Sequence, residues 1–337
     1  MENNAEIYDV AIIGSGPSGL TAGIYTSRAD LKTILFAGLK WGGQLMLTTE
    51  VENFPGFPEG IMGPELMMNM RKQAERYGTK IIDVNFSQGD FSQRPFKLTA
   101  EDGETFYSKS IIIATGADTK WLQIPGEEEK IGRGVSSCAP CDAAFYRNKK
   151  VAVIGGGDSA MEEAIVLAKF AKEVFLIHRR EEFRASEIML KRAMDNPKIH
   201  FIFNTSPIEV LGDGKVEAIR LVTDPKLMIK KAGEEKKEAT PESLGGKMIM
   251  GAEKFTWDFA VDGMFVAIGH IPNSSVFPDI TKNKKGFIDR VHGTSTNIDG
   301  VFVAGDVYDH RYMQGVTAAA YGCEAALDAE RWLGDQE

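Results

Sequence analysis

Cys138-Ala-Pro-Cys141 and Val151-Ala-Val-Ile-Gly-Gly-Gly-Asp-Ser-Ala160 lie close together in the middle of the chain. The first segment holds two cysteines separated by two residues, a spacing at which they can form a small disulfide that reopens easily. The second is an apolar run that ends in Gly-x-Gly-x-x-Ala, the pattern of a strand whose phosphate-binding turn begins a helix. The sequence therefore predicts a redox-active cysteine pair beside a dinucleotide site.

A second dinucleotide pattern stands near the start of the chain. Tyr8–Ile13 is apolar enough for a buried strand, and Leu20–Ala29 has the pattern of a helix. In the turn between them, Gly14 would permit a tight bend, Gly16 would let a pyrophosphate approach the backbone, and Gly19 would let helix and strand pack closely. The predicted phosphate-binding residues are Gly14, Ser15, Gly16, Pro17, Ser18 and Gly19.

Basic residues follow the strand that comes after the second glycine turn. This strand is expected at Glu173–Ile177, and the residues after it include His178, Arg179, Arg180 and Arg184. An NAD site has a carboxylate here, which would repel a 2′-phosphate, whereas guanidinium groups bind one well. The second site is therefore predicted to prefer NADPH to NADH. A solvated, basic start of a helix is the alternative.

Composition excludes several classes of function. A formal net charge of −9 provides no basic excess for a nucleic-acid partner. The acidic start of the chain has no apolar region typical of a signal peptide, and no 18 apolar residues run together as a membrane span would require. With only three cysteines, the chain is expected in the reducing cytoplasm, where a C-x-x-C pair is more often catalytic than structural.

The order of the motifs predicts two domains, a number that suits a chain of 337 residues. Apolar runs at 263–269 and 300–306 resemble the predicted strand 110–116, so the C-terminal part is expected to complete the first domain. We predict an α/β fold with two Rossmann-like dinucleotide-binding domains, the second inserted in the first. The first would contain residues 1–119 and 262–337, and the second residues 120–261.

Three further segments carry structural predictions. Residues 198–222 are expected to form paired strands around the turn at Gly212–Gly214, and the charged residues 230–242 a solvated loop at a hairpin tip. An Ala-rich helix is expected at Gln314–Leu333, with Cys323 as a buried structural thiol.

The chain resembles low-molecular-weight, NADPH-dependent thioredoxin reductases over nearly its whole length. Each matching segment is modest by itself, but their order and spacing are highly specific. The segments that carry the resemblance are Gly14–Gly19, Gly43-Gln44, Glu52–Gly56, Ala114–Gly116, Cys138–Asp142, Gly155–Ala160, His178–Arg184, Ala267–His270 and Ala304–Asp306.

The resemblance implies that the first site binds FAD and the second NADPH. It implies a homodimer that reduces thioredoxin. The residues it assigns to FAD, besides the first glycine turn, are Gly43, Gln44, Thr48, Asn53, Thr115, Gly116, Asp306, Gln314 and Gly315. Those assigned to NADPH are Gly155, Gly157, Asp158, Ser159, His178, Arg179, Arg180 and Arg184. Met313, Gly315 and Ala143 depart from the residues usual in this family.

The resemblance also implies roles at the cysteine pair. Cys141 would lie next to the flavin ring, and Cys138 would attack the disulfide of thioredoxin through a mixed disulfide. Asp142 is placed to exchange a proton with the leaving sulfur, with helix capping as its alternative role.

Other readings of the cysteine pair stay open at this point. A zinc site would need two further ligands, and the sequence offers no second C-x-x-C or paired histidines, so we expect no metal. The alternative enzyme is a related flavin dithiol-disulfide oxidoreductase acting on another small disulfide protein or a low-molecular-weight disulfide. A flavin-bound redox sensor is the non-enzymatic alternative.

Overall fold

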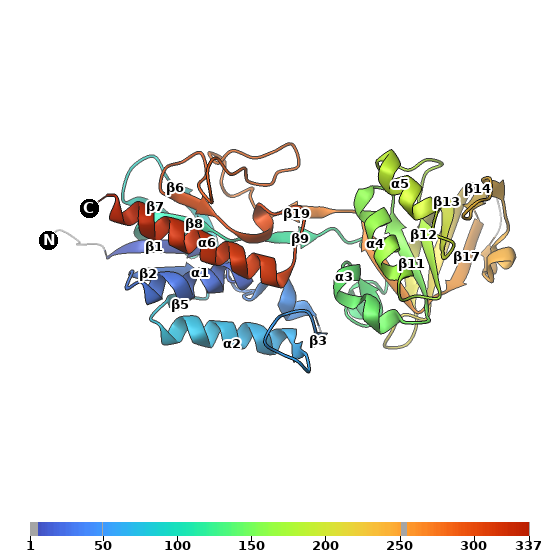
Figure 1. Cartoon of the computed structure of the whole chain (residues 1–337), viewed down its shortest axis with the longest axis horizontal. Coiled ribbons are helices and arrows are strands. Elements are labelled where there is room, and N and C mark those ends of the chain that lie inside the picture. Colours follow the sequence, from blue (N-terminus) through green and yellow to red (C-terminus); the bar gives the residue numbers. More distant parts are fainter. Residues whose placement is uncertain (1–5, 49, 251–254, 337) are drawn as a thin grey trace. The chain divides into compact units, whose positions relative to one another are not determined.

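The computed structural model describes residues 6–48, 50–250 and 255–336. The chain divides into two compact units (Figure 1). Unit 1 contains residues 1–118 and 270–337, and unit 2 contains residues 119–269. The chain therefore passes between the units twice. Short strands β9 (Ala117–Thr119) and β19 (His270–Pro272), which carry the two crossings, pair with each other.

The described residues of unit 1 form a seven-stranded sheet in the order β5-β2-β1-β8-β7-β6, with β20 also paired to β8. The strands β5, β2, β1 and β20 run parallel to their neighbours, and β7 runs antiparallel to β8. The strands are β1 (Ile7–Ile13), β2 (Thr33–Phe36), β5 (Lys80–Ile82), β6 (Phe86–Asp90), β7 (Phe96–Ala100), β8 (Thr105–Ile113) and β20 (Val301–Val303).

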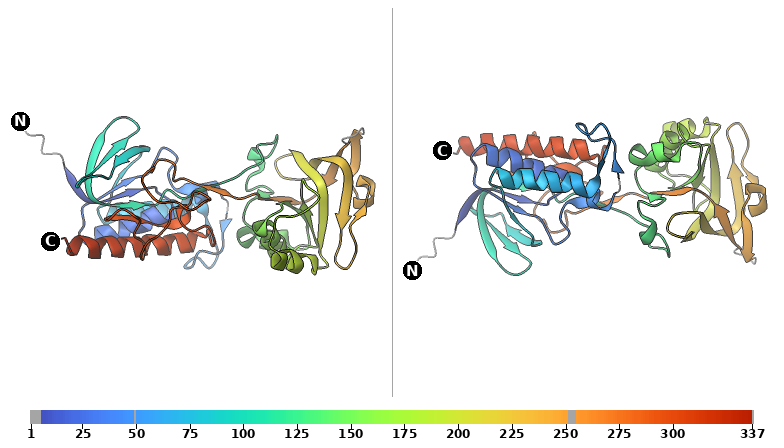
Figure 2. Two further views of the ribbon diagram at one scale, coloured as in Figure 1. Left: turned by 90° about the horizontal axis from the view of Figure 1, so that it is seen from above. Right: turned by 90° about the horizontal axis from the view of Figure 1, so that it is seen from below.

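Side chains of β1 alternate between two cores, as expected for a strand buried on both faces. Val10 and Ile12 pack against helices α1 (Pro17–Arg28), α2 (Gly63–Arg76) and α6 (Gly315–Gly334), which lie side by side on one face (Figure 2). Ala11 and Ile13 pack on the other face, within an aromatic cluster that includes Phe36, Phe96 and Phe277. Parallel pairing of β20 with β8 confirms that residues 300–306 complete this domain.

The described residues of unit 2 form a nine-stranded sheet in the order β10-β18-β11-β12-β13-β14-β17-β16, with β15 paired to β14. Its first five strands are parallel, and the rest are antiparallel. The strands are β10 (Val135–Ser136), β11 (Lys150–Gly155), β12 (Glu173–Ile177), β13 (Ile199–Leu211), β14 (Ala218–Lys230), β15 (Lys237–Glu238), β16 (Lys247–Met250), β17 (Phe255–Ala260) and β18 (Gly263–Ala267).

Helices α4 (Asp158–Ala168) and α5 (Glu187–Met194) cover one face of this sheet. Val151 and Val153 of β11 pack on that face, while Ala152 and Ile154 pack on the other with Trp257. The strands predicted around Gly212–Gly214 are confirmed as the β13–β14 hairpin.

The placement of strand β18 corrects the sequence analysis. Residues 263–269 were expected to return to the first domain, but β18 pairs in parallel with β11 and β10 inside unit 2. Its apolar run and terminal glycine fit the centre of either parallel sheet equally well, so local pattern cannot assign it. The second crossing consequently lies at Gly269–His270 rather than at 261–262.

Candidate active site

The three glycines of the first turn have the three different surroundings expected of a dinucleotide site. Gly14 has a φ of +111°, and a Cβ there would lie 2.2 Å from the carbonyl oxygen of Ala114. A Cβ at Gly19 would lie 1.9 Å from the carbonyl oxygen of Gly14, so helix α1 packs directly on the turn. A Cβ at Gly16 would meet nothing within 4 Å. The space at Gly16 is therefore open to a ligand, whereas the other two positions are closed by the protein itself.

The other residues of this turn hold it in place. Pro17 occupies the first turn of α1, a position where its missing N–H costs no hydrogen bond. The buried Ser15 hydroxyl donates to the carbonyl oxygen of Ala37 at 2.7 Å and accepts from the amide of Gly42 at 2.9 Å. Ser18 is buried beside Gly305, where a Cβ would lie 2.5 Å from the serine Oγ. These serines join the turn to neighbouring loops.

Asp306 follows strand β20. Among the residues that the structure describes, its buried Oδ1 has no hydrogen-bond partner. Burial, together with the nearby charge of Asp309, raises the pKa of Asp306 to about 7. Asp309 itself accepts from the backbone amides of Arg311, Tyr312 and Met313, so it fixes the loop before α6. A buried, unpaired carboxyl oxygen is a place where a bound hydroxyl group could donate.

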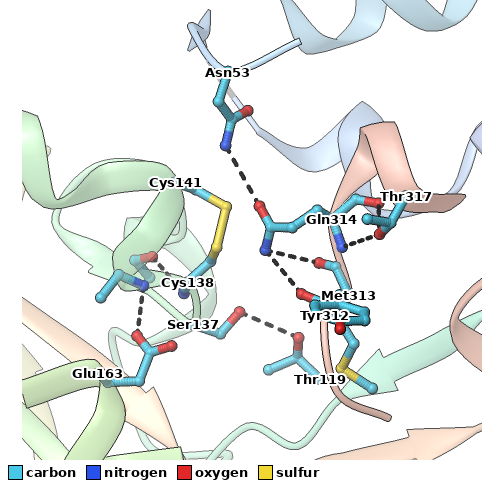
Figure 3. The surroundings of a disulfide bond; sticks show 12 residues. Asn53, Thr119, Ser137, Cys138, Cys141, Glu163, Tyr312, Met313, Gln314 and Thr317 are labelled. Atoms are coloured by element: carbon cyan, nitrogen blue, oxygen red, sulfur yellow. Dashed lines mark hydrogen bonds between the residues drawn. A yellow bond between two sulfur atoms is a disulfide. The ribbon is translucent and has the colours of Figure 1, made fainter. Parts of the chain in front are cut away.

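Polar contacts join loops of unit 1 that are far apart in the sequence, and Figure 3 shows the contact between Asn53 and Gln314. The amide of Asn53 donates to Oε1 of Gln314 at 3.4 Å, and Gln314 also caps helix α6 together with Thr317. Gln44 donates to the carbonyl oxygen of Ala117 and to Asp118, both at 3.3 Å. The structure thus brings together Asn53 and Gln314, which are far apart in the sequence.

Gly43, Thr48 and Gly315 lie on or beside the short helix that carries Gln44. A Cβ at Gly43 would lie 3.4 Å from the Cα of Gly16, so this loop passes close to the open position. Thr48 ends the short helix Gly43–Leu47 that carries Gln44. A Cβ at Gly315 would lie 3.3 Å from Leu45 Cδ1, so the alanine usual in the resembled family would need only a small shift here.

Asn273 is a residue of this site that the sequence analysis missed. The Thr115 hydroxyl donates to its carbonyl oxygen at 2.7 Å, and the Asn273 side chain donates back to the Thr115 carbonyl oxygen at 3.2 Å. The amide of Asn273 also donates to Gly116. These bonds fix the Thr115-Gly116 turn after β8. No local sequence pattern indicates these hydrogen bonds, because Thr115 and Asn273 are more than 150 residues apart.

The glycine turn of unit 2 repeats the geometry of the first. A Cβ at Gly155 would lie 2.5 Å from the carbonyl oxygen of Ala267 and 2.6 Å from the Cβ of Ala160. A Cβ at Gly157 would meet nothing within 4 Å. Gly157 thus corresponds to Gly16 as the open position of its turn, and Ala160 takes the place of the third glycine.

His178 lies behind this turn. Its ring is buried and would lie 2.3 Å from a Cβ at Gly156, and its Nε2 is 3.0 Å from the carbonyl oxygen of Glu182. Burial lowers the pKa of His178, which favours the neutral ring. The ring stacks on Phe183. The geometry is that of a residue that supports the turn.

The three arginines are exposed on the segment after β12. The backbone amide of Arg184 donates to the carbonyl oxygen of Gly156 at 2.7 Å, which anchors this segment to the glycine turn. In the described part of the chain, the guanidinium groups of Arg179, Arg180 and Arg184 form no ion pair. They are therefore available to an anionic ligand.

Asp158 and Ser159 begin helix α4 and are exposed. Asp158 accepts from the amide of Ser186 at 2.6 Å, which ties the start of α4 to the start of α5. Lys236, from the charged segment expected to be a solvated loop, donates to the Glu181 carbonyl oxygen at 2.7 Å. The charged segment therefore contacts the arginine segment.

Cys138 and Cys141 form a disulfide at the start of α3 (Ala139–Asp142) (Figure 3). Cys141 is exposed and Cys138 half-buried. Because both sulfurs are bonded to each other, the pair provides no thiolates for zinc in this state. The third cysteine, Cys323, is free and only partly buried in α6, so it is less enclosed than the sequence analysis expected.

Asp142 is held beside the disulfide. Burial raises the pKa of its carboxyl group, and a hydrogen bond with Ser136 acts in the opposite direction. The Ser136 hydroxyl also accepts from the amide of Cys138 at 3.1 Å. Asp142 precedes the short helix Ala143–Tyr146 but makes no side-chain hydrogen bond as its cap. No capping hydrogen bond therefore supports the alternative role of Asp142 in the described structure, and proton exchange stays a prediction.

Glu163 of α4 is the second carboxyl group near the disulfide, and the sequence analysis missed it. Its Oε2 accepts from the amide of Ala139 at 2.5 Å (Figure 3). Burial raises the pKa of Glu163 to about 8. One signal was present in the sequence: Glu163 lies beside the helical stripe of Ala160, Ala164 and Leu167, where a core-facing carboxylate is unusual.

Comparison with known proteins identifies the family. The model of the pyridine nucleotide-disulphide oxidoreductase family matches residues 8–322. The chain belongs to the pyridine nucleotide-disulphide oxidoreductases.

Several proteins named thioredoxin reductase are similar to this pyridine nucleotide-disulphide oxidoreductase. The thioredoxin reductase of Mycolicibacterium smegmatis is 46% identical over 342 residues, covering 100% of both chains. The bifunctional thioredoxin reductase/thioredoxin of Mycobacterium leprae is 46% identical over 98% of this chain and 66% of its own length. The solved thioredoxin reductase of Giardia duodenalis has a TM-score of 0.82 at 38% identity, covering 98% of this chain and 99% of that chain.

These findings confirm the resemblance to thioredoxin reductases and the α/β fold with two dinucleotide-binding domains. Within its described residues, this pyridine nucleotide-disulphide oxidoreductase has no helix both long and apolar enough to cross a membrane.

Proposed function

We propose that the protein is a thioredoxin reductase that passes electrons from NADPH, through FAD and the Cys138–Cys141 disulfide, to thioredoxin. The observation that carries this proposal is the position of the disulfide. It lies at the start of α3 and is joined, through Ala139 and Glu163, to the helix that begins at the second glycine turn. A redox-active pair and a nucleotide turn thus share one small unit.

The residues of the first site fit FAD. The open position at Gly16 can receive a pyrophosphate, and the orphaned Oδ1 of Asp306 can accept a hydrogen bond from a ribityl hydroxyl group. Gln44, Asn53 and Gln314 would surround the flavin portion. When bound, FAD supplies electron transfer between a nicotinamide and a disulfide.

The residues of the second site fit NADPH. Gly157 provides the open position for a pyrophosphate at the start of α4. The exposed arginines, which form no ion pair within the described residues, can bind a 2′-phosphate through charge-assisted hydrogen bonds. His178 and Asp158 would hold the turn and the arginine segment in position.

The cysteine pair would perform the exchange with the protein substrate. In the reduced enzyme, the Cys138 thiolate attacks one sulfur of the thioredoxin disulfide, forming a mixed disulfide and releasing the other sulfur. Asp142, whose carboxyl pKa is raised by burial, would exchange a proton with a leaving sulfur. Cys141 then attacks Cys138, reforms the internal disulfide and releases reduced thioredoxin. Two electrons have moved from the dithiol to the substrate.

The decisive experiment is an assay of NADPH-dependent disulfide reduction with thioredoxin, oxidised glutathione and lipoamide supplied separately. We expect turnover with thioredoxin and at most slow reduction of the small disulfides. Faster reduction of another disulfide would favour the related dithiol-disulfide oxidoreductase. Bleaching of the flavin by NADPH without turnover on any disulfide would favour a redox sensor. The name of the Mycobacterium leprae relative, which joins thioredoxin reductase and thioredoxin, supports thioredoxin as the partner.

Replacing Gly16 with alanine should separate cofactor binding from folding. The backbone at Gly16 has φ −67° and ψ −176°, which alanine adopts readily, and its Cβ would enter open space. That space is where the pyrophosphate must approach. We expect Gly16→Ala to keep its circular dichroism spectrum and to lose at least about tenfold in FAD affinity, measured by flavin fluorescence during titration.

Gly19→Ala provides the contrast for this experiment, because its Cβ would collide with the turn itself. It should lower the yield of folded protein. Tight FAD binding by Gly16→Ala would contradict the assignment of the first site.

Asp306 should give the flavin-free protein a pH-dependent stability. Its pKa is about 7 in the folded chain against about 3.9 for an unfolded aspartate, so the folded state keeps a proton that the unfolded state has lost. The free energy of unfolding should therefore fall as pH rises from about 4 to 7. In thermal melts of flavin-free protein, Asp306→Asn should gain stability relative to the unsubstituted protein between pH 5 and 7.5. Parallel melting curves would contradict the assignment of this shift to Asp306.

We further propose a homodimer in the cytoplasm. The support for both is the likeness to thioredoxin reductases, together with a cysteine content that suits a reducing compartment. Sedimentation equilibrium of the holoenzyme tests the assembly directly.

A further inference from the structure

Glu163 links the two functional parts of unit 2. It lies on α4, whose first residue follows the open Gly157 of the nucleotide turn. Its Oε2 accepts from the amide of Ala139 at 2.5 Å, and Ala139 is fully buried next to Cys138 (Figure 3). A single side chain thus fixes the first residue of α3, which lies between the two cysteines, to the helix that follows the second glycine turn.

The surroundings of Glu163 are acidic. Asp142 from α3 and Glu162 from α4 are the charged groups that act on it, and both favour its neutral form. Tyr146, in the short helix after α3, interacts electrostatically with Asp142. Its pKa is raised to about 12, mainly by burial, so the tyrosine is uncharged and does not offset the acidic groups. In the described part of the chain, Glu163 forms no ion pair. Burial raises its pKa to about 8, so the group is mostly a neutral carboxylic acid at pH 7.

We propose that Glu163 is a positioning residue for the Cys138–Cys141 pair: it holds the start of α3 through the amide of Ala139 and sets how readily a thiolate forms beside it. The inference rests on the proposed function, since it concerns the reduced state of that dithiol. The family of the chain and the assignment of residues to the first site are independent of this inference.

Reduction of the disulfide leaves a negative charge on the cysteine pair. Two electrons from NADPH break the S–S bond, and the uptake of one proton leaves one sulfur as a thiol and the other as a thiolate. A neutral Glu163 does not oppose that negative charge. An ionised Glu163 would repel it, because like charges in a partly buried site disfavour each other. Above about pH 8 the protein should therefore favour the disulfide more strongly than below.

Glu163→Gln removes the charge and keeps an oxygen that can accept from Ala139, whereas Glu163→Leu removes both. The first measurement is the dithiol–disulfide equilibrium of the holoenzyme against dithiothreitol, from pH 6.5 to 9.5, read by alkylation and mass spectrometry. The dithiol–disulfide equilibrium constant of the unsubstituted protein, divided by that of Glu163→Gln, should be constant below about pH 7. By pH 9.5 the unsubstituted protein should favour the disulfide about threefold to tenfold more than Glu163→Gln does. Glu187→Gln, the same charge change on α5, is the matched control and should follow the unsubstituted protein.

The second measurement separates position from charge. Glu163→Leu should lower turnover with thioredoxin about tenfold, because the α3 turn loses its anchor, while the stopped-flow rate of flavin reduction by NADPH stays within about twofold. Glu163→Gln should restore most of this turnover at pH 7.

Two results would overturn the inference: a pH-independent ratio for Glu163→Gln, or unchanged turnover in a folded Glu163→Leu. If Glu163→Leu does not fold, the Glu163→Gln equilibrium still decides. Failure of the unsubstituted enzyme to reduce thioredoxin would instead count against the proposed function, because the equilibrium measurement needs no thioredoxin.

Discussion

Cys138→Ser and Cys141→Ser should each lower NADPH-driven reduction of thioredoxin at least about a thousandfold. Either change removes one sulfur of the disulfide at the start of α3, so no internal dithiol can be formed. A serine hydroxyl is neither ionised near neutral pH nor able to carry the exchange. Steady-state turnover with thioredoxin in excess measures the effect directly.

The control for this experiment is Cys323→Ser. Cys323 is free and belongs to α6 of unit 1, so turnover should stay within about twofold. Flavin reduction by NADPH should survive in all three variants, since it does not need the sulfurs. Undiminished turnover in Cys138→Ser would eliminate the sulfur relay as the route of electrons to thioredoxin.

The double replacement of Arg179 and Arg184 by alanine should raise the KM for NADPH about a hundredfold and leave the KM for NADH within about threefold. Both side chains are exposed, and the backbone of Arg184 is anchored to the glycine turn at Gly156. Each lost charge-assisted hydrogen bond to a 2′-phosphate is worth about 1.5–3 kcal/mol, or roughly tenfold or more in affinity. NADH has no 2′-phosphate and so loses nothing.

Arg192→Ala is the matched control, because Arg192 is an exposed arginine on α5 of the same unit. It should leave both KM values unchanged. An equal rise for NADPH and NADH in the double variant would mean that the arginines hold the turn and do not read the phosphate.

The glycine turns could be predicted from sequence because their chemistry is local. A strand, a phosphate-binding turn and a helix lie within about 25 residues, and each glycine has a steric reason that its neighbours reveal. The structure shows the steric part of this reasoning in the contrast between Gly14, which the backbone closes, and Gly16, which is open, while phosphate binding stays a prediction. The disulfide could also be predicted from local sequence, because Cys138 and Cys141 are separated by only two residues.

Features that depend on long-range pairing could not be predicted in this way. Strand β18 has the same apolar character as β20, and only its hydrogen-bonding partners assign it to unit 2. Asn273 and Glu163 act on residues that are distant in the sequence or on another helix, so their types carry no local signature. The assignment of His178 to the second site stays a prediction, and the sequence could not show that its ring lies behind the glycine turn.

The two ends of unit 2 meet. The amide of Lys120 donates to the carbonyl oxygen of Gly269 at 3.0 Å, within the paired crossings of β9 and β19. A segment whose entry and exit are neighbours can be excised and replaced as one block, with two splice points only a hydrogen bond apart. Grafting residues 119–269 of another family member onto this scaffold is therefore a practical route to chimeras with exchanged nucleotide preference or protein partner.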